Sequence, residues 1–319
     1  SDFKVGAVAA KAGKRADADD AGVIRTVLQN VYGVNPSSVS KVIDPETGEP
    51  LVVYHGTSEQ FSEFRYEKLG ATTGSASSVQ GFFFSDNPYD SGTYAALAFD
   101  VRTLEGAFDE GRRQYFEARG RAEHWVEDLF SRTVGVVEDY SDPSVVLRKL
   151  EDFAKALPFS QDVRVADGRV FFGREVVGRV VKSSSGREYF FSERSGFFRK
   201  KFFDGIVGVL IAEELGVPIQ RNFLAVRSPK VLDNTRRRIK IGVSAKKRPG
   251  TDGTNFRGIV DPLLANHWIV YASNQIKSAT GNSGAFDPEN PDIRFSRKRP
   301  GQSKQNAASF SAGGRVIAP

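Results

Sequence analysis

Short runs of β-favouring residues occur near the start and near the end of the chain. Branched and aromatic side chains dominate residues 51–54, 82–84, 223–226, 259–260 and 268–271, which predicts buried strands. The first run leads directly into His55, Gly56 and Thr57. A strand that ends this way is a candidate ligand-binding rim, because glycine permits a backbone geometry or a close ligand approach that other residues block. A histidine with a purely structural role explains the short pattern equally well.

Helical periodicity of apolar residues alternates with these runs. Asp86-Asn87-Pro88 ends a strand and begins a helix that carries Tyr94 and Leu97. Further helices are predicted over residues 21–31, 102–130, 143–157 and 197–215. Gly216 is placed to cap the last of these helices at its C-terminal end.

The middle of the chain has a sheet pattern of its own. Residues 163–191 alternate between apolar and polar side chains. The pairs Asp167-Gly168 and Ser185-Gly186 interrupt this alternation and are typical of tight turns. We therefore expect a small antiparallel sheet here, flanked by the charged helices.

Polar stretches predict loops and mobile ends. Residues 70–78 are rich in glycine, serine and threonine, and the chain is polar from residue 282 onward, so we expect a mobile loop and a poorly ordered tail. Residues 1–21 lack the apolar core of a secretory signal and are expected to be a mobile leader. No run approaches the roughly 18 apolar residues that a membrane span needs.

Composition narrows the possible chemistry. The 319 residues are 39% hydrophobic and 26% charged, as in an ordinary globular protein with a sizeable core. There is no cysteine, which excludes disulfides, thiolate nucleophiles and cysteine zinc sites. With only three histidines, at positions 55, 124 and 267, we predict no metal site.

The positive charge is concentrated in one stretch. The net charge is +6, and residues 227–248 contain nine basic residues against the single acid Asp233. A solvated loop face is the simpler interpretation, and an anion-binding surface for nucleic acid or an acidic protein is the alternative. The residues that would make this contact are Arg236, Arg237, Arg238, Lys246, Lys247 and Arg248.

Three separated motifs together resemble a known family. They are Tyr54-His55-Gly56-Thr57, Gly81-Phe82-Phe83-Phe84-Ser85 with Tyr94, and Trp268-Ile269-Val270-Tyr271 followed by Asn274-Gln275-Ile276-Lys277-Ser278-Ala279. Their order and spacing resemble the ADP-ribosyltransferases of the diphtheria-toxin and poly(ADP-ribose) polymerase type. The likeness is closest to the transferase domains of phage and mobile-element polyvalent proteins, which often end in a tail similar to residues 286–296.

The resemblance implies a fold and a domain plan. It implies an α+β protein with a split antiparallel β-sheet core that grips NAD, and it extends over residues 42–99 and 223–298. Residues 100–222 are then an inserted region of helices and β-hairpins. Residues 1–41 form a leader with a short helix, and residues 299–319 form a flexible tail.

The resemblance also implies roles for individual residues. His55 would hydrogen-bond a ribose of NAD, the backbone of Gly56 would pair with the nicotinamide carboxamide, and Thr57 would support the loop. Phe83 occupies the place of an active-site tyrosine, although a core phenylalanine explains it as well. Ser85 lies in the same motif, and the ring of Tyr94 would stack on nicotinamide, whose flat face suits an aromatic clamp.

One position departs from the family pattern. The family has a glutamate eight residues before the glutamine, and counting back from Gln275 gives His267. That glutamate orients a ribose hydroxyl and stabilises the positive charge that develops when nicotinamide leaves. A neutral His267 can accept a hydrogen bond but supplies no charge, and losing one such partner costs about 10²–10³ in rate. The alternatives are slow or lost turnover, or a contribution from Gln275 or from another acid.

The resulting functional hypothesis is a mono-ADP-ribosyltransferase that moves ADP-ribose from NAD to a host protein or nucleic acid. We expect it in a phage virion or in the host bacterial cytoplasm, without membrane association. The alternative is a catalytically degenerate fold that binds NAD, nucleic acid or a protein. Nucleic-acid binding as the main function is less favoured, because the basic stretch lacks regularly interleaved aromatic residues.

Overall fold

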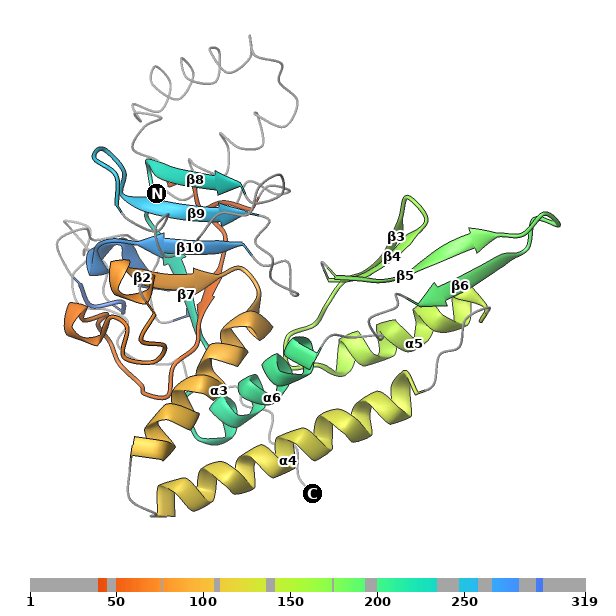
Figure 1. The fold of residues 1–319 in the computed structure, drawn as a ribbon, viewed down its shortest axis with the longest axis horizontal. Helices are drawn as coiled ribbons and strands as arrows, with labels where there is room; N and C mark the ends of the chain where they lie inside the picture. The colour runs from red at the N-terminus through yellow and green to blue at the C-terminus, as the bar shows by residue number, and fades with distance from the viewer. Residues whose placement is uncertain are drawn as a thin grey trace, which may run out of the picture.

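Figure 1 shows the fold in a computed structural model of the chain. The structure describes residues 40–44, 50–75, 77–105, 110–135, 141–173, 175–192, 200–233, 247–257, 266–280 and 291–294. The predicted helix over residues 21–31, the predicted strand over residues 259–260 and both predicted mobile ends, 1–21 and 299–319, lie outside these residues.

The larger sheet is built from both ends of the described chain. Its strands are β1 (Val53–His55), β2 (Phe82–Ser85), β7 (Gln220–Leu224), β8 (Pro229–Asp233), β9 (Gly253–Arg257), β10 (His267–Val270) and β11 (Ile276–Ser278). They are arranged in the order β11-β7-β1-β2-β10-β9-β8. Two short 3-10 turns, η2 (Tyr66–Lys68) and η3 (Ser78–Gln80), lie between β1 and β2, and η4 (Ser273–Gln275) precedes β11.

This sheet corrects the prediction of a purely antiparallel core. Neighbouring strands are antiparallel except for β8 and β9, which run parallel from the pair Pro229 and Gly253 onward. Parallel neighbours need a long crossover. The connection between Asp233 and Gly253 is long enough, but its sequence reads only as a basic loop.

Helices and a second sheet occupy the middle of the chain. The helices are α3 (Pro88–Glu105), α4 (Glu110–Thr133), α5 (Pro143–Ala156) and α6 (Lys200–Glu214). The strands β3 (Val163–Ala166), β4 (Arg169–Phe172), β5 (Glu175–Lys182) and β6 (Glu188–Ser192) form an antiparallel sheet in chain order. In Figure 1, α3 and α6 lie side by side, α4 runs along them, and α5 lies against the small sheet.

The small sheet confirms the turn signals in the sequence. Asp167 and Gly168 have φ angles of 51° and 70°, and Gly186 has a φ angle of 82°, so all three adopt the left-handed conformation. Asparagine, aspartate and glycine tolerate this conformation, which two-residue hairpins require. The predicted antiparallel hairpins are therefore confirmed.

Other element boundaries differ from the prediction. The helix expected over residues 102–130 is wrong as a single element, because residue 102 belongs to α3 and α4 begins only at Glu110. The expected boundaries of the insertion, after residues 99 and 222, fall inside α3 and β7. Gly106 follows the last residue of α3 in the sequence, and a glycine in that place is a helix-stop signal that the prediction did not use.

Part of the polar tail is anchored to the large sheet. Ile293 is buried and packs with Phe64 and Val270. Its backbone N–H donates to the carbonyl of Ser62 at 2.9 Å. The Nζ of buried Lys277 donates to the carbonyl of Asp292 at 3.0 Å. The expectation of a poorly ordered tail is thus wrong for residues 291–294, because one apolar side chain and these backbone bonds hold them.

Helices α3 and α6 approach so closely that glycine is needed at their contact. A Cβ on Gly92 would collide with the carbonyl of Gly205, and a Cβ on Gly208 would collide with the carbonyl of Gly92. Both helices contribute to the main hydrophobic core through Tyr89 and Ile206. The glycine contact therefore sets the distance between the two helices.

We predict that Gly208→Ala lowers the free energy of unfolding by about 1–3 kcal/mol, because the added methyl group must push the two helices apart. Chemical denaturation measures this change. Gly120→Ala on α4 is the matched control, since a Cβ there meets no atom within 4 Å. Alanine at this position should stabilise the protein by up to about 1 kcal/mol through helix propensity. Equal effects of the two substitutions would contradict the close α3–α6 contact.

Candidate functional site

His55 joins the end of β1 to the middle of β2. Its Nδ1 lies 2.9 Å from the carbonyl oxygen of Phe83. Since the carbonyl can only accept, Nδ1–H donates this bond and Nε2 carries the lone pair. Aromatic rings enclose the imidazole, with centroid distances of 5.0 Å to Phe64, 5.5 Å to Phe84 and 6.2 Å to Phe61. The ring is therefore held in one orientation with Nε2 as the remaining acceptor.

The surroundings of His55 favour its neutral form. Burial lowers the pKa of the imidazole below its usual value of 6.5, and the hydrogen bond to the Phe83 carbonyl opposes this only in part. At neutral pH the ring is uncharged, so Nε2 can accept a hydrogen bond from a hydroxyl group.

Gly56 makes room for helix α3. A Cβ at this position would collide with the backbone carbonyl of Ser91 and approach the backbone nitrogen of Ala95. The glycine at the strand end is thus explained by a close approach of the helix, whereas the sequence suggested a close approach of a ligand. Beside it, Thr57 Oγ1 accepts a hydrogen bond from the Glu59 backbone N–H at 3.2 Å and closes a tight turn.

Strand β2 presents its rings to both sides of the sheet. Phe82 and Phe84 are buried in a cluster with Val53 and Trp268. Phe83 packs on the other side, against the small cluster that contains Ile269. Because side chains alternate along a strand, Phe83 touches His55 through its carbonyl and directs its ring away from it.

The turn between β2 and α3 is fixed by polar side chains. Ser85 Oγ accepts a hydrogen bond from the Asn87 backbone N–H at 3.1 Å, and Asn87 Oδ1 accepts from the Tyr89 backbone N–H at 2.9 Å. Asp86 accepts two bonds from Asn266, one from the backbone N–H and one from Nδ2, each at 2.8 Å. The residue before β10 is therefore tied directly to the start of α3.

His267 forms a buried pair with Asp90. Its Nε2 lies 2.6 Å from Asp90 Oδ2. The Asp90 side chain is completely buried and that of His267 is 11% exposed. A buried carboxylate is costly unless it is hydrogen-bonded to a partner of this kind. The acid that the sequence could not locate near His267 is thus Asp90, in the first turn of α3.

Nothing in the sequence points to this pairing. Asp90 and His267 are 177 positions apart, and an acid in the first turn of a helix is ordinarily explained by the helix dipole. Asp86 lies just before α3 and Asp90 in its first turn, and they bond to the adjacent residues Asn266 and His267.

Gln275 is fully occupied by backbone contacts. Its Oε1 accepts from the backbone N–H groups of Tyr271 and Ala272, at 3.2 and 2.9 Å. Its Nε2 donates to the carbonyls of Ala225 and Asp252, at 3.0 and 2.9 Å. These four bonds hold the turn before β11 in place. They give Gln275 a structural role, and its catalytic role stays a prediction.

The three sequence motifs converge on the segment from Phe83 to Ala95. His55 bonds to the carbonyl of Phe83, Gly56 packs on α3 at Ser91, and His267 bonds to Asp90. The two imidazole rings nevertheless lie on opposite faces of the sheet. Tyr54 and His267 are both register partners of Ser85, and His55 follows Tyr54, so it points the other way.

Unpaired polar atoms lie beside His55. Gln220 is its register partner on β7, and Gln220 Oε1 is buried without a hydrogen-bond partner. The buried side-chain amide of Asn222, two residues further along β7, also lacks partners. Buried polar atoms are nearly always hydrogen-bonded in folded proteins, so these atoms suit a polar ligand or water at this end of β1.

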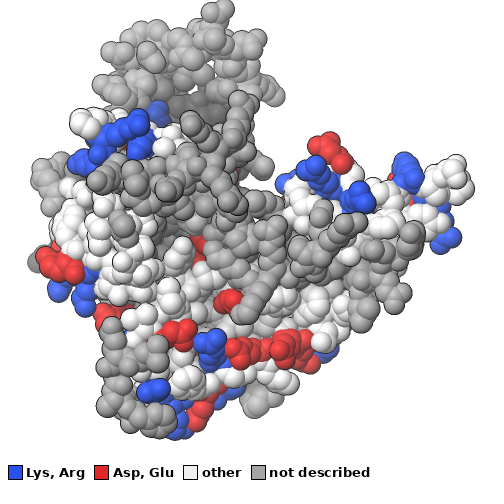
Figure 2. Space-filling view, viewed as in Figure 1, with Lys and Arg blue, Asp and Glu red and all other residues white. Residues whose placement is uncertain are grey.

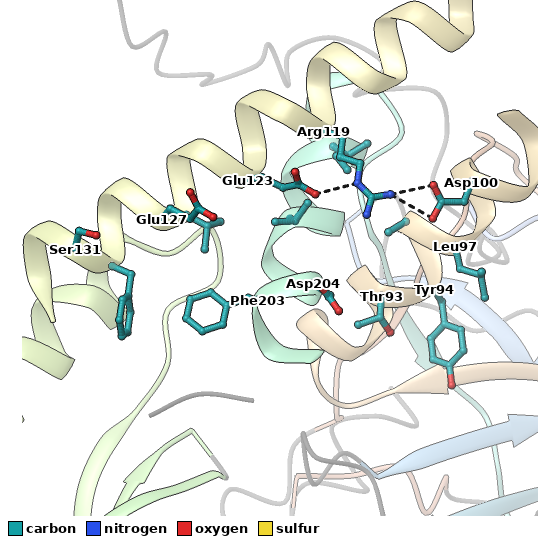
Figure 3. Close-up of a pocket in the computed structure, with 15 residues that line it drawn as sticks. Thr93, Tyr94, Leu97, Asp100, Arg119, Glu123, Glu127, Ser131, Phe203 and Asp204 are labelled. Carbon is teal, nitrogen blue, oxygen red and sulfur yellow. Dashed lines mark hydrogen bonds and ion pairs between the residues drawn. The ribbon is translucent and has the colours of Figure 1, made fainter. Parts of the chain in front are cut away.

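Tyr94 lines a groove between helices. The groove has a volume of about 900 Å³ and is lined by α3, α4 and α6. Figure 3 shows Tyr94 and Leu97 on α3 on one side, with Glu123 and Glu127 on α4 along another. Tyr94 is 41% exposed, so its ring is accessible from this groove.

Part of the basic stretch gathers near the edge of the large sheet. Burial lowers the pKa of Lys230 in β8, and nearby Arg248 lowers it further, so the two cations lie close together. Figure 2 shows basic side chains gathered on the surface near β8 and β9. Arg236, Arg237, Arg238 and Lys246 lie outside the described residues.

The described residues contain neither a cluster suited to a metal ion nor a helix suited to a membrane. Within that part of the chain, no group of three or more histidine, aspartate or glutamate side chains is placed to hold a metal ion. No helix in it has the length and apolar character needed to cross a membrane.

Comparison with known families identifies one segment of the chain. Residues 45–106 match the family described as ADP-ribosyltransferase in polyvalent proteins. The match confirms the resemblance inferred from the sequence, and it contains β1, β2 and α3. No match was found among curated proteins or among solved structures.

The environment of His55 predicts a pH-dependent stability. With the native pKa below 6.5, the unfolded state binds more protons as the pH falls through that value. The free energy of unfolding should therefore decrease as the pH is lowered from about 7 toward 5. His55→Gln should flatten this dependence in denaturation experiments. The same substitution at exposed His124 is the control, and a pH dependence that persists unchanged in His55→Gln would contradict the assignment.

Proposed function

We propose that the protein is a mono-ADP-ribosyltransferase that transfers ADP-ribose from NAD to a host macromolecule. The observation that carries this proposal is the location of the family match. Residues 45–106 supply β1, β2 and α3, which carry His55 and Asp90, and Asp90 bonds to His267 of β10. In this proposal the large sheet corresponds to the split sheet of the family, although its described strands form one hydrogen-bonded series.

The residues near the end of β1 suit recognition of a nucleotide sugar. Neutral His55 presents Nε2 as an acceptor for a ribose hydroxyl, which is itself a donor. Gln220 Oε1 is a second unfilled acceptor beside it. We assign the backbone of Gly56 and the turn held by Thr57 to the same binding region, whereas Ser85, the register partner of His267, lies on the opposite face of the sheet with the buried pair. Tyr94 is the candidate for contact with the nicotinamide ring, because the ring of Phe83 is directed away from His55.

The pair of Asp90 and His267 offers a source of negative charge. Cleavage of the bond between ribose and nicotinamide develops positive charge on the ribose, and a fixed negative charge nearby lowers the barrier. His267 alone cannot supply this charge, but Asp90 lies 2.6 Å from its Nε2. We propose that Asp90 orients the imidazole and provides the charge through it. His267 then takes the position of the missing glutamate, while Asp90 acts as the positioning residue.

A binding module without turnover is the second candidate, favoured by one observation. The hydrogen bond to Asp90 occupies one ring nitrogen of His267, and the ring is 11% exposed. If protonated, it would place a positive charge where the reaction also develops positive charge. Such a site would bind NAD without cleaving it.

The enzymatic proposal predicts label transfer from radiolabelled NAD to components of a bacterial lysate. His55→Ala should reduce the transfer by about tenfold or more. The substitution removes the hydrogen bond between the imidazole and the cofactor, and it removes the packing of the imidazole against the neighbouring aromatic rings. His124→Ala, on the exposed face of α4, is the control and should leave the transfer unchanged. Measurable NAD binding without any transfer would instead support the binding module.

Substitutions at the buried pair test the charge assignment. Asp90→Asn keeps the shape of the side chain but removes its charge, so release of nicotinamide should slow by about 10²–10³-fold. NAD affinity, measured by calorimetry, should change by less than about threefold, since the effect belongs to the transition state. A matched fall in affinity and rate would show that Asp90 acts only on binding or folding.

A double substitution separates charge from position. His267→Glu alone would bury two carboxylates side by side and destabilise the site. Asp90→Asn combined with His267→Glu removes this repulsion and restores the family arrangement of a single acid on β10. We expect the double variant to release nicotinamide faster than Asp90→Asn alone. Equal rates in the two variants would contradict the alignment of β10 with the family's glutamate strand.

A further inference from the structure

The groove between α3, α4 and α6 lies next to the proposed reaction site and has its own chemical character. Asp90 and Tyr94 are four residues apart on α3, so they occupy the same helix face one turn from each other. Asp90 contacts His267, and Tyr94 lines the end of the groove. A molecule in the groove would therefore extend to within about one helical turn, roughly 5.4 Å, of the buried pair.

The groove is acidic in a protein that is basic overall. Among the lining residues that the structure describes, four are carboxylates, namely Asp100, Glu123, Glu127 and Asp204, and one is a cation, Arg119. Arg119 is already paired with Asp100 at 3.1 Å and with Glu123 at 3.0 Å. The charge of the lining is thus −3 by count (four acids and one base), whereas the whole chain carries +6.

Apolar and aromatic surface accompanies this charge. Tyr94 and Leu97 are 41% and 39% exposed and lie three residues apart on one stripe of α3. Elsewhere on the lining, the rings of Phe130 and Phe203 pack edge to face with their centroids 5.4 Å apart. Figure 3 shows the rings of Tyr94 and Phe203 on the lining, together with the carboxylates of Glu127 and Asp204. Aromatic faces bordered by carboxylates suit lysine and arginine side chains, which contact both.

We propose that this groove docks a basic, amphipathic segment of the protein that accepts ADP-ribose. The inference rests on the proposed transferase function and specifies its substrate class. The acidic lining attracts a basic polypeptide and repels nucleic-acid phosphates. The exposed stripe of Tyr94 and Leu97 provides the apolar contact that an amphipathic segment needs. Tyr94 then belongs to both sites, and the docked segment carries the acceptor side chain toward the bound NAD.

Fluorescence anisotropy with defined probes tests this docking without NAD. The probes are a labelled amphipathic peptide of lysine, leucine and alanine, the same peptide with glutamate in place of lysine, and a single-stranded oligonucleotide. The variant combines Glu123→Lys with Glu127→Lys, and both residues are exposed on α4. The matched control is Asp128→Lys, since Asp128 is an exposed neighbour on the same helix outside the groove lining.

We expect the lysine peptide to bind the unmodified protein and the control alike. The double variant should bind it at least about tenfold more weakly, because two attractive charges become repulsive. Circular dichroism must show that all the proteins are folded. Tighter binding of the glutamate peptide or of the oligonucleotide, equal losses in variant and control, or no binding of the lysine peptide would overturn the proposal.

A transfer assay separates this inference from the proposed function. If labelled NAD modifies lysate proteins and the double variant modifies them equally well, the transferase function stands and the docking inference fails. If no transfer occurs but the lysine peptide binds in the groove, docking stands and the transferase function fails. Reduced protein labelling with unchanged release of nicotinamide to water would support both.

Discussion

Helix α3 is held at backbone distance on two sides, and the candidate site depends on this constraint. Gly56 at the end of β1 leaves no room for a side chain beside Ser91. On a neighbouring face of the helix, Gly92 meets Gly205 and Gly208 of α6 with equally little space. The helix therefore cannot shift relative to the large sheet. Asp90 is thereby fixed beside His267, and Tyr94 is fixed at the mouth of the helical groove.

The same constraint links segments that are distant in the sequence. β1, β2 and α3 come from residues 45–106, which match the transferase family, while α6 and β10 come from later in the chain. The turn between β2 and α3 ties them together, because Asp86 bonds to Asn266 and Asp90 bonds to His267. His267, where the resemblance to the family predicts a glutamate, is thus accompanied by a buried acid from another element.

Local pattern was enough to predict most of the fold that the structure describes. The buried strand over Phe82–Ser85, the helix over Pro143–Ala156 and the hairpins of the small sheet follow from periodicity and turn residues within a short window. The parallel pairing of β8 with β9 was not predictable, since partner strands are chosen by tertiary packing. The anchoring of Ile293 was missed because one apolar residue in a polar stretch carries no periodic signal.

The site was predictable only in part, for a similar reason. The motif around His55 predicted a strand end, and β1 does end at His55, whereas the role of His55 in binding stays a prediction. Gly56 proved to accommodate α3, and Gln275 proved to hold a turn, since residue type alone does not reveal which neighbour a side chain meets. Asp90 was missed because its partner is 177 residues away.

A titration with NAD in which NMR monitors the imidazole signals of the three histidines tests the central claim most directly. The claim is that NAD binds where β1, β2, β10 and α3 meet. The account predicts that NAD shifts the imidazole signals of His55 and His267 and leaves that of exposed His124 unchanged. Signals of His55 and His267 that do not respond to NAD, or that respond no more than that of His124, would contradict it.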